Sequence, residues 1–410
     1  MPQLKERPSY LAQMEAVRDN GFVKVMTGMR RCGKSSLLEL FARHLRASGV
    51  DAANVVQADF ESFEFESVHT YQDMYRLLAS RLAPSGRTYL LLDEVQLVDG
   101  WERAVNALRV DKDVDVYLTG SNAHLLSSQL ATLLSGRQLE IRVYPLTFSE
   151  FLAFVDAPPS EASFDRFVRY GGLPPVVEQG TDHRLAVTVL AGVYGTVLVR
   201  DIAQHAQVRN QLAFDDVARF LADTAGSSVS TPNIGRRLAS AHRKTSGETV
   251  ERYVQALVDA FLFYRAARFD AKGGEYLRGL AKYYPSDLGI KNMMLGFRPA
   301  DYGFALENVV HNELLARGCD VAVGKVGGLE VDFVATRTRD DMTRDITYVQ
   351  VTASMLDPTT RARELRPFAS LGDVPGRRLV ITLDRLGLGE AGGGVEVVNA
   401  LDWLTTGGLR

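Results

Sequence analysis

The chain has 410 residues, of which 46% are hydrophobic and 24% are charged, and its formal net charge is −3. These proportions are ordinary for a globular protein and exclude wholesale disorder and a collagen-like fibre. No apolar run approaches the roughly 18 residues of a membrane span, and residues 1–10 lack the apolar core of a secretion signal. The two cysteines, Cys32 and Cys319, are too few for a disulfide framework. We therefore expect a cytoplasmic protein without membrane contact.

The length predicts several domains, since a single hydrophobic core rarely grows beyond about 250–300 residues. In the first third of the chain, short apolar runs alternate with helical patterns. An amphipathic helix is predicted over residues 35–47, and strands over residues 22–26, 54–60, 88–92 and 115–119. Near-continuous apolar strands separated by helices are typical of a parallel sheet that is covered on both faces. We therefore predict an α/β domain in this part of the chain.

The rest of the chain has two kinds of pattern. Residues 146–225 have helical patterns separated by loops. Strand patterns return further on, over residues 330–335, 346–352, 378–383 and 395–399. The sequence therefore predicts a helical middle and a second, smaller α/β domain.

A phosphate-binding loop is predicted at residues 28–35 (GMRRCGKS), which match G-x-x-x-x-G-K-[ST] between a predicted strand and a predicted helix. Gly28 and Gly33 allow a backbone path that turns amide N–H groups inward, where a Cβ would obstruct it. These amides and the N-terminus of the helix suit the β- and γ-phosphates of ATP. We expect Lys34 to bridge the same phosphates and the Ser35 hydroxyl to bind Mg²⁺. The predicted nucleotide-binding residues are Gly28, Met29, Arg30, Arg31, Cys32, Gly33, Lys34, Ser35 and Ser36.

A second motif lies at residues 90–94 (LLLDE), where a buried-type strand ends in two carboxylates. Asp93 is placed to hold Mg²⁺ through water, and Glu94 to act as the general base that polarises the attacking water. The next predicted strand is followed by Ser121 and Asn122. Either side chain can contact the γ-phosphate or orient the water.

This combination resembles the AAA+ and signal-transduction branch of the P-loop NTPases, which implies that Asn122 is the polar residue called sensor 1. More narrowly, an ordered set of motifs is similar to a prokaryotic family that joins an AAA-type ATPase to a C-terminal domain of unknown function. These motifs are GMRRCGKSS (28–36), DEVQ (93–96), TGSNA (119–123), GR (136–137), PLTFSEFL (145–152) and GGLP (171–174). The resemblance spans nearly the whole chain. It implies a homo-oligomer, of which a ring is one form.

Arg137 has two interpretations. In AAA-type rings, an arginine from a neighbouring subunit neutralises the charge that develops on the γ-phosphate, and Arg137 is a candidate for this arginine finger. Alternatively, Arg137 is a structural surface arginine, and Arg142 and Arg200 are rival candidates for the finger.

Residues 212–264 are predicted to form three helices followed by an aromatic strand. The second helix turns Ile234 and Leu238 inward, and the third begins at a cap formed by Thr245 or Ser246. The third helix has apolar residues at helical spacing: Val250, Tyr253, Val254 and Leu257. With residues 261–264 and 282–284 as wing strands, the segment resembles a winged helix-turn-helix, whose third helix usually enters a major groove.

The charge of this segment favours DNA as its partner. Residues 231–282 contain ten Lys or Arg and five Asp or Glu, so their net charge is +5 in a chain whose total is −3. Basic residues placed in this way suit contacts with phosphates. The predicted DNA-binding residues are Arg236, Arg237, Arg243, Lys244 and Arg252. The alternative is a winged helix that serves as an ATPase lid or a protein interface.

The C-terminal segment has a helix with Glu307, a strand with Asp332 and a further strand with Gln350 and Thr352. This order resembles nucleases of the PD-(D/E)xK class, in which carboxylates hold Mg²⁺ and a lysine orients a water. Here Gln350 replaces an acid, and Thr352 occupies the lysine position. A neutral amide weakens a cation site, and threonine cannot supply an ammonium group. We therefore predict a nuclease-like domain that recognises or packs against nucleic acid without cutting it.

These observations divide the chain into four parts. They predict an AAA+ type P-loop ATPase core (1–145), a helical lid or linker (146–210), a winged-helix domain (211–290) and a restriction-endonuclease-like domain (291–410). The leading hypothesis is a Mg²⁺-dependent ATPase that works as an oligomeric motor or remodeller on duplex or branched DNA. The main alternative is an ATP-dependent signalling switch with a protein partner, and a weaker one is an ATP-gated nuclease.

Overall fold

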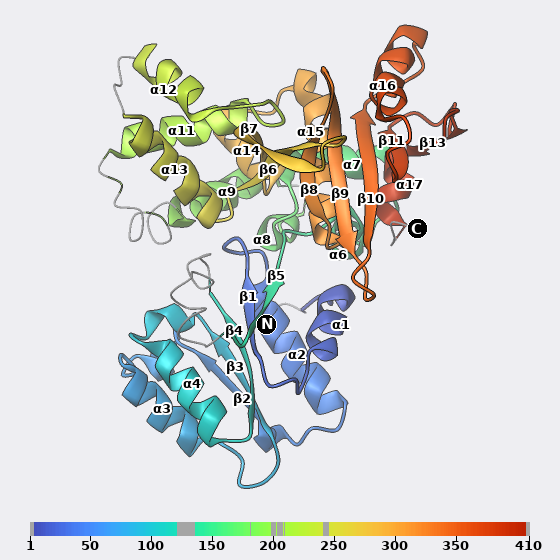
Figure 1. Cartoon of the computed structure of the whole chain (residues 1–410). Helices are drawn as coiled ribbons and strands as arrows, with labels where there is room; N and C mark the ends of the chain where they lie inside the picture. Colours follow the sequence, from blue (N-terminus) through green and yellow to red (C-terminus); the bar gives the residue numbers. More distant parts are fainter. Residues whose placement is uncertain are drawn as a thin grey trace. The chain divides into compact units, whose positions relative to one another are not determined.

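A computed structural model of the chain describes residues 4–120, 136–180, 182–197, 202, 208, 210–240 and 246–406 (Figure 1). The chain divides into two compact units. The first unit comprises Met1–Tyr144 with Asp259–Phe261, and the second comprises Pro145–Val258 with Leu262–Arg410. The three parts predicted after residue 145 thus fall in the second unit, apart from Asp259–Phe261. Within the described ranges, every helix is too short or too polar to traverse a lipid bilayer.

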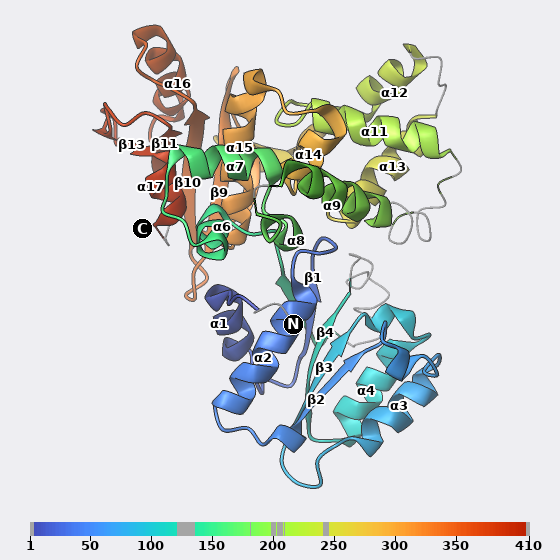
Figure 2. The same cartoon turned by 180° about the vertical axis from the view of Figure 1, so that it is seen from behind.

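The first unit is a parallel sheet with the strand order β2-β3-β4-β1-β5. Its strands are β1 (Val23–Thr27), β2 (Val55–Asp59), β3 (Thr88–Asp93), β4 (Val114–Thr119) and β5 (Gln138–Arg142). Its helices are α1 (Pro8–Ala16), α2 (Lys34–Ala47), α3 (Tyr71–Ser80) and α4 (Trp101–Asp111), with short 3₁₀ turns η1 (Ala52–Asn54), η2 (Phe63–Phe65) and η3 (Val95–Leu97). Figures 1 and 2 show α1 and α2 on one face of the sheet and α3 and α4 on the other. The predicted parallel α/β fold is confirmed.

The sequence did not indicate β5. Its residues (QLEIR) are mostly half-buried or exposed, and Ile141 is the buried one. Because β5 is the edge strand beside β1, one side of it needs no apolar cover. It therefore lacks the apolar run that marks the three inner strands, β3, β4 and β1.

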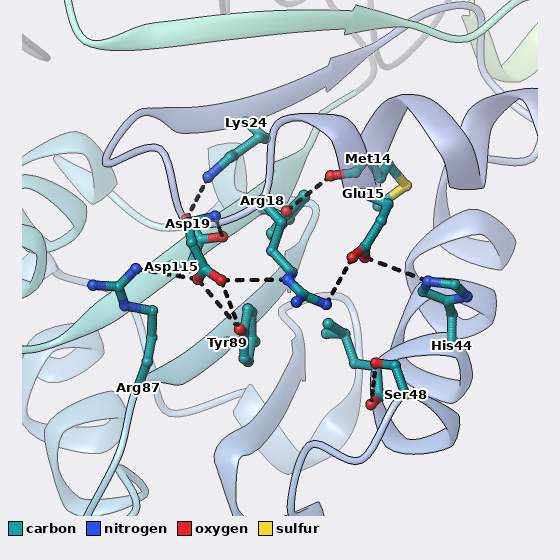
Figure 3. Close-up of polar contacts among 12 residues, drawn as sticks. Met14, Glu15, Arg18, Asp19, Lys24, His44, Ser48, Arg87, Tyr89 and Asp115 are labelled. Atoms are coloured by element: carbon teal, nitrogen blue, oxygen red, sulfur yellow. Dashed lines mark hydrogen bonds and ion pairs between the residues drawn. The ribbon is translucent and has the colours of Figure 1, made fainter.

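A buried ion pair lies near the amino-terminal ends of the central strands. Lys24 on β1 contacts Asp115 on β4, and their side chains are 0% and 2% exposed. The other oxygen of Asp115 accepts the backbone N–H of Asp19 at 3.0 Å. Arg87 and Tyr89, from β3 and the residues just before it, contact the Asp19 carboxylate, as Figure 3 shows. This network joins the loop before β1 to two further strands.

The second unit contains a mixed sheet with the strand order β12-β13-β11-β10-β9-β8-β6-β7. Its strands are β6 (Phe263–Asp270), β7 (Glu275–Pro285), β8 (Asp320–Val326), β9 (Leu329–Thr338), β10 (Arg344–Thr352), β11 (Arg377–Thr382), β12 (Gly389–Glu390) and β13 (Val395–Asn399). Its helices before this sheet are α6 (Phe148–Val155), α7 (Glu161–Tyr170), α8 (Pro174–Val177), α9 (His183–Thr196), α11 (Gln211–Asp223), α12 (Thr231–Ser240) and α13 (Gly247–Asp259). Those within and after it are α14 (Leu288–Leu295), η6 (Pro299–Asp301), α15 (Tyr302–Ala316), α16 (Pro358–Leu371) and α17 (Ala400–Thr405).

Alternating residues divide the core of the second unit between the two faces of its sheet. Phe333 and Val349 face the cluster that includes side chains of α6, α7, α15 and α17. Their strand neighbours Val334 and Tyr348 join a separate cluster with Phe368 of α16. This alternation is the period-two pattern of strands that are buried on both faces.

The predicted wing strands have a different role in the structure. They fall in β6 and β7, which form an antiparallel hairpin and belong to the same sheet as the C-terminal strands. The connection is the parallel pairing of β6 with β8, in which Arg268 lies opposite Val323. Because an isolated two-stranded hairpin is marginally stable, pairing with a larger sheet stabilises it. The C-terminal part of the predicted winged-helix segment is therefore continuous with the C-terminal sheet.

The residues GGLP (171–174) wrap around a buried carboxylate. Asp287 is 3% exposed, and its Oδ2 accepts the N–H of Gly172 at 2.7 Å. Its Oδ1 accepts the N–H of Ile290 at 3.2 Å and so caps α14. Gly171 has φ +78°, and a Cβ there would lie 2.2 Å from Asp287 Oδ1. The glycine therefore lets the turn after α7 close on the start of α14.

We expect Gly171→Ala to lower the free energy of unfolding by about 3 kcal/mol or more, because a steric clash adds to the strain of a positive φ. Gly318→Ala is the matched control, since Gly318 has φ +79° and open space at its Cβ position. The control should cost about 1–2 kcal/mol. Chemical denaturation followed by circular dichroism measures both losses. Equal losses would show that the contact with Asp287 does not restrict this position.

Candidate functional site

The predicted phosphate loop joins the end of β1 to the start of α2. Gly28 has φ +141°, and a Cβ there would lie 2.1 Å from the carbonyl oxygen of Val143, just after β5. Gly33 has φ +105° and precedes the first residue of α2. Both glycines are therefore required by the backbone, and Gly28 is required by close packing as well.

Lys34 turns back onto this loop. Its Nζ donates to the carbonyl oxygens of Gly28 at 2.8 Å and Met29 at 3.1 Å, and the residue is 5% exposed. Ser35 and Ser36 follow in the first turn of α2, and both are exposed. The Cys32 thiol is buried and donates to the Val143 carbonyl at 3.3 Å, which is a packing contact. The loop thus presents one ammonium group and two accessible hydroxyls.

The two carboxylates of the second motif lie at the carboxyl end of β3. The Thr119 hydroxyl, at the end of the neighbouring β4, donates to Asp93 Oδ1 and accepts the backbone N–H of Glu94 at 3.2 Å. Glu94 has a left-handed backbone with φ +52°. Burial raises the pKa of Glu94, and the nearby charge of Lys34 opposes this shift. Lys34, Asp93 and Glu94 therefore share one site.

Arg7 supports the phosphate loop, and no motif in the sequence marked it. The residue is 2% exposed. Its guanidinium donates from Nη1 to the Cys32 carbonyl and from Nη2 to the Tyr144 carbonyl, each at 3.1 Å. The loop is thereby tied to the segment after β5. Thr119 was likewise missed as a positioning residue, although it opens the motif TGSNA.

The arginine-finger candidates occupy different ends of the sheet. Arg137 is exposed and lies just before β5, where its carbonyl accepts the N–H of Val23 at 2.9 Å. It is therefore at the amino-terminal edge of the sheet, whereas the phosphate loop follows the carboxyl end of β1. Arg142 lies opposite Thr27 beside the loop and pairs with Glu140 at 3.1 Å. Asn122, Ser121 and Arg200 lie outside the described residues.

Of the predicted DNA-binding residues that the structure describes, Arg236 and Arg237 lie on α12 and Arg252 lies on α13. Phe214 of α11 stacks edge-to-face on Tyr253 of α13, with their ring centroids 5.2 Å apart. Five of the residues predicted to face inward on α12 and α13 are buried: Ile234, Val250, Tyr253, Val254 and Leu257. The side chain of Leu238 lies outside the described part of the structure. The Ser246 hydroxyl accepts the N–H of Thr249 at 3.2 Å, as expected of a cap.

The predicted basic residues on these helices differ in their surroundings. Arg236 is exposed and donates to Asn233. Arg237 pairs with Asp223 at 3.5 Å. Arg252 is exposed, and no acidic side chain within the described part of the chain forms an ion pair with it. Arg243 and Lys244 lie outside the described residues.

One member of the +5 charge count does not belong to a surface patch. Lys282 is buried on β7 and pairs with Glu307 at 3.2 Å and Glu330 at 2.8 Å. Its charge is neutralised by these carboxylates inside the second unit. The predicted basic patch is therefore smaller than the composition indicated.

The predicted nuclease-like residues come together on α15, β9 and β10. Asp332 Oδ2 accepts the N–H of Val351 at 2.8 Å. Gln350 Nε2 donates to Glu364 at 2.8 Å, and the Thr352 hydroxyl donates to the Ser354 carbonyl at 3.2 Å. Gln350 and Thr352 thus make internal hydrogen bonds.

Comparison with known proteins gives matches over most of the chain. Residues 20–152 match a family described as AAA domain, and residues 161–301 match a domain of unknown function (DUF8612). An uncharacterized protein of Haemophilus influenzae is 38% identical over 403 residues, covering 97% of this chain and 98% of its own. The chain belongs to the family of this relative. Its first unit carries an AAA domain, as the resemblance implied.

More distant similarities have lower coverage. An uncharacterized protein of Methanocaldococcus jannaschii is 26% identical over 362 residues, covering 84% of this chain and 78% of its own. Among solved structures, the RuvB Holliday junction branch migration motor of Thermotoga maritima is 17% identical and covers 63% of this chain and 88% of its own. The TM-score of that pair is 0.33, which is too low to support a functional argument.

We expect Arg7→Met to weaken binding of a non-hydrolysable ATP analogue to the AAA domain by about tenfold, because two buried carbonyl groups lose a charged donor. Isothermal titration calorimetry measures the affinity. Arg43→Met is the matched control, since Arg43 lies on α2 of the same unit, is exposed and pairs with Glu39. An Arg7 variant with the affinity of the control would contradict the supporting role.

Proposed function

We propose that this protein is a Mg²⁺-dependent ATP hydrolase. The observation that carries the proposal is the convergence of Lys34, Asp93 and Glu94 at the carboxyl edge of one parallel sheet. This edge is where α/β sheets bind their ligands. Hydroxyl and carboxylate oxygens suit Mg²⁺, and an ammonium group beside glycine-rich backbone suits phosphates.

Each residue has a defined task in this reaction. The backbone N–H groups of residues 28–35 and the Lys34 ammonium bind the phosphates of ATP, so Lys34 exchanges its carbonyl partners for phosphate oxygens. Ser35 would bind Mg²⁺ directly and Asp93 would hold it through water, and the ion would neutralise charge on the phosphate oxygens. Glu94 accepts a proton from the attacking water, and Thr119 keeps Asp93 and the Glu94 backbone in place. Asn122 remains the candidate that orients the water.

An oligomer is part of the proposal. Arg137 lies at the amino-terminal edge of its own sheet, so it cannot serve the phosphate loop at the opposite edge. We propose that it acts on the γ-phosphate of a neighbouring subunit in a homo-oligomer, in the manner of an arginine finger.

We expect Glu94→Gln to retain ATP binding and to lose nearly all turnover, because the amide keeps the shape of the base but cannot accept the proton. Lys34→Ala should weaken ATP binding itself. Because burial raises the pKa of Glu94, wild-type turnover should fall as the pH drops through that raised value. Phosphate release measures turnover, and binding of a non-hydrolysable ATP analogue measures the affinity for nucleotide. The control Glu102→Gln, on α4, should behave as wild type, and wild-type turnover by Glu94→Gln would refute the assigned base.

We further propose that the second unit binds DNA and that ATP hydrolysis remodels the bound duplex or junction. The support is the exposed pair of arginines, Arg236 and Arg252, on two helices of a three-helix cluster. Arginine contacts with phosphates confer affinity that depends on salt and little on sequence. The unpaired state of Arg252 among the described residues favours this use over an internal structural one.

Replacing Arg236 and Arg252 together with Gln should weaken binding to all DNA sequences alike. The slope of log affinity against log salt should flatten by about 1–2, near 0.9 for each lost contact. DNA-stimulated hydrolysis should fall, while basal hydrolysis persists because the phosphate loop lies in the other unit. Fluorescence anisotropy at several salt concentrations measures the binding. Arg339→Gln is the control, because Arg339 follows β9 and pairs with Asp345 on β10. This variant should change neither the DNA affinity nor its salt slope.

Two results would redirect this proposal. Absence of DNA binding at low salt would favour a signalling switch with a protein partner. Unchanged affinity and salt slope in the double variant would move the DNA site to other residues of the second unit.

A further inference from the structure

A compact group of charged side chains joins β7, α15 and β9 in the second unit. The Nζ atom of Lys282 lies 3.2 Å from Glu307 Oε1 and 2.8 Å from Glu330 Oε1. The Lys282 side chain is 6% exposed, and that of Glu307 is 12% exposed. The Tyr284 hydroxyl donates to the same Glu307 oxygen at 2.7 Å. One ammonium group therefore bridges two carboxylates that come from different elements.

A third carboxylate belongs to the same group. Asp332 lies two residues after Glu330 on β9, so the two side chains share one face of the strand. Desolvation and the charge of Glu307 raise the pKa of Asp332 well above its ordinary value, and the charge of Lys282 opposes this shift. Burial would lower the pKa of Lys282, but the charges of Glu307, Asp332 and Glu330 raise it above its ordinary value. Lys282 is thus the positive centre of three acidic residues.

Resemblance to PD-(D/E)xK nucleases implies a divalent metal ion at this place, and the residues present do not fit one. The Lys282 ammonium stands between two of the acidic side chains. Gln350, at an acid position, donates its amide to Glu364. Across the residues that the structure describes, no group of three or more His, Cys, Asp or Glu side chains is arranged to hold a metal ion.

We propose that Lys282 is a resident cation that neutralises Glu307, Glu330 and Asp332 in place of a divalent metal ion. The nuclease-like core therefore keeps its acidic residues without a metal-bound water and does not hydrolyse phosphodiesters. Lys282 comes from the β6–β7 hairpin and is not part of the PD-(D/E)xK pattern. The position at which that pattern has its lysine is occupied by Thr352. Because this hairpin follows α13, the ion group also attaches the helical segment to the C-terminal core.

The proposal has a direct physical consequence. A carboxylate that loses its buried ionic partner is left uncompensated, at a large cost in stability. Three carboxylate groups in one place are hard oxygen ligands, which divalent cations prefer. Around Lys282 these side chains are not arranged to hold a metal ion, so removing the ammonium group should let them turn toward one divalent cation and bind it. This inference does not depend on ATP hydrolysis or DNA binding.

The test uses the full chain without nucleotide and with Asp93→Asn, which weakens the predicted metal site of the AAA domain. In this parent, Lys282→Met should bind Mn²⁺ at least about tenfold more tightly than the parent does, because the acidic residues lose their resident cation. Electron paramagnetic resonance of free Mn²⁺ measures the affinity. Mn²⁺ should also raise the melting temperature of the Lys282 variant, since a ligand stabilises the state that binds it.

Lys291→Met is the matched control. Lys291 is also buried in the second unit, with a side chain 6% exposed, and it pairs with Asp301 at 3.1 Å. Its loss should create no Mn²⁺ site. Adding Glu307→Gln to the Lys282 variant should abolish the new Mn²⁺ binding.

Three results would overturn the proposal. The first is tight Mn²⁺ binding by the parent that is lost on Glu307→Gln. The second is a folded Lys282→Met protein with no gain in Mn²⁺ affinity, and the third is a gain that survives Glu307→Gln. If Lys282→Met does not fold, Lys282→Gln removes the charge while retaining a hydrogen-bond donor, and the same outcomes apply.

Discussion

The close approach of Gly28 to the Val143 carbonyl is the constraint on which the proposed nucleotide site depends. β1 lies between β4 and β5, so its carboxyl end leaves the sheet with neighbours on both sides. A Cβ at position 28 would overlap the backbone that follows β5, and the loop would have to move away. Arg7 strengthens the same junction by binding carbonyl groups on both sides of it. The phosphate loop is therefore held by its neighbours as well as by its own glycines.

The AAA domain uses β4 to organise the chemistry at both ends of β3. At the carboxyl end, Thr119 contacts Asp93 and the backbone of Glu94. Near the amino-terminal end, Asp115 takes part in the network that includes Arg87 and Tyr89 (Figure 3). A rigid strand with a polar side chain near each end can thus position residues that are far apart in sequence. Such preorganisation lowers the cost of arranging charged groups around a reacting phosphate.

Buried charges recur as the means by which distant segments are joined. Lys24 pairs with Asp115 in the first unit, and Lys282 pairs with Glu307 and Glu330 in the second. Such pairs contribute little net stability when intact, because desolvation offsets their attraction, but breaking one partner is costly. They therefore favour one arrangement of the chain over alternatives that would separate the partners. In the second unit, the arrangement that they favour places the hairpin after α13 in the same sheet as the C-terminal strands.

The sequence by itself determined the features that depend on neighbouring residues. The strand, glycine loop and helix from β1 to α2 follow from residues 22–47, because backbone conformation and phosphate chemistry there are local. Asp93 and Glu94 were recognisable for the same reason, as was the inward face of α13. Tertiary structure alone decided which remote residues complete each site. Arg7 contacts the carbonyl of Cys32 in the phosphate loop, 25 residues further along the chain. In the second unit, Lys282 on β7 contacts Glu307 on α15, which is also 25 residues further along. β5 and the shared sheet of β6 to β13 likewise depend on pairing between distant strands, which no local pattern specifies because any exposed edge offers the same hydrogen-bonding groups.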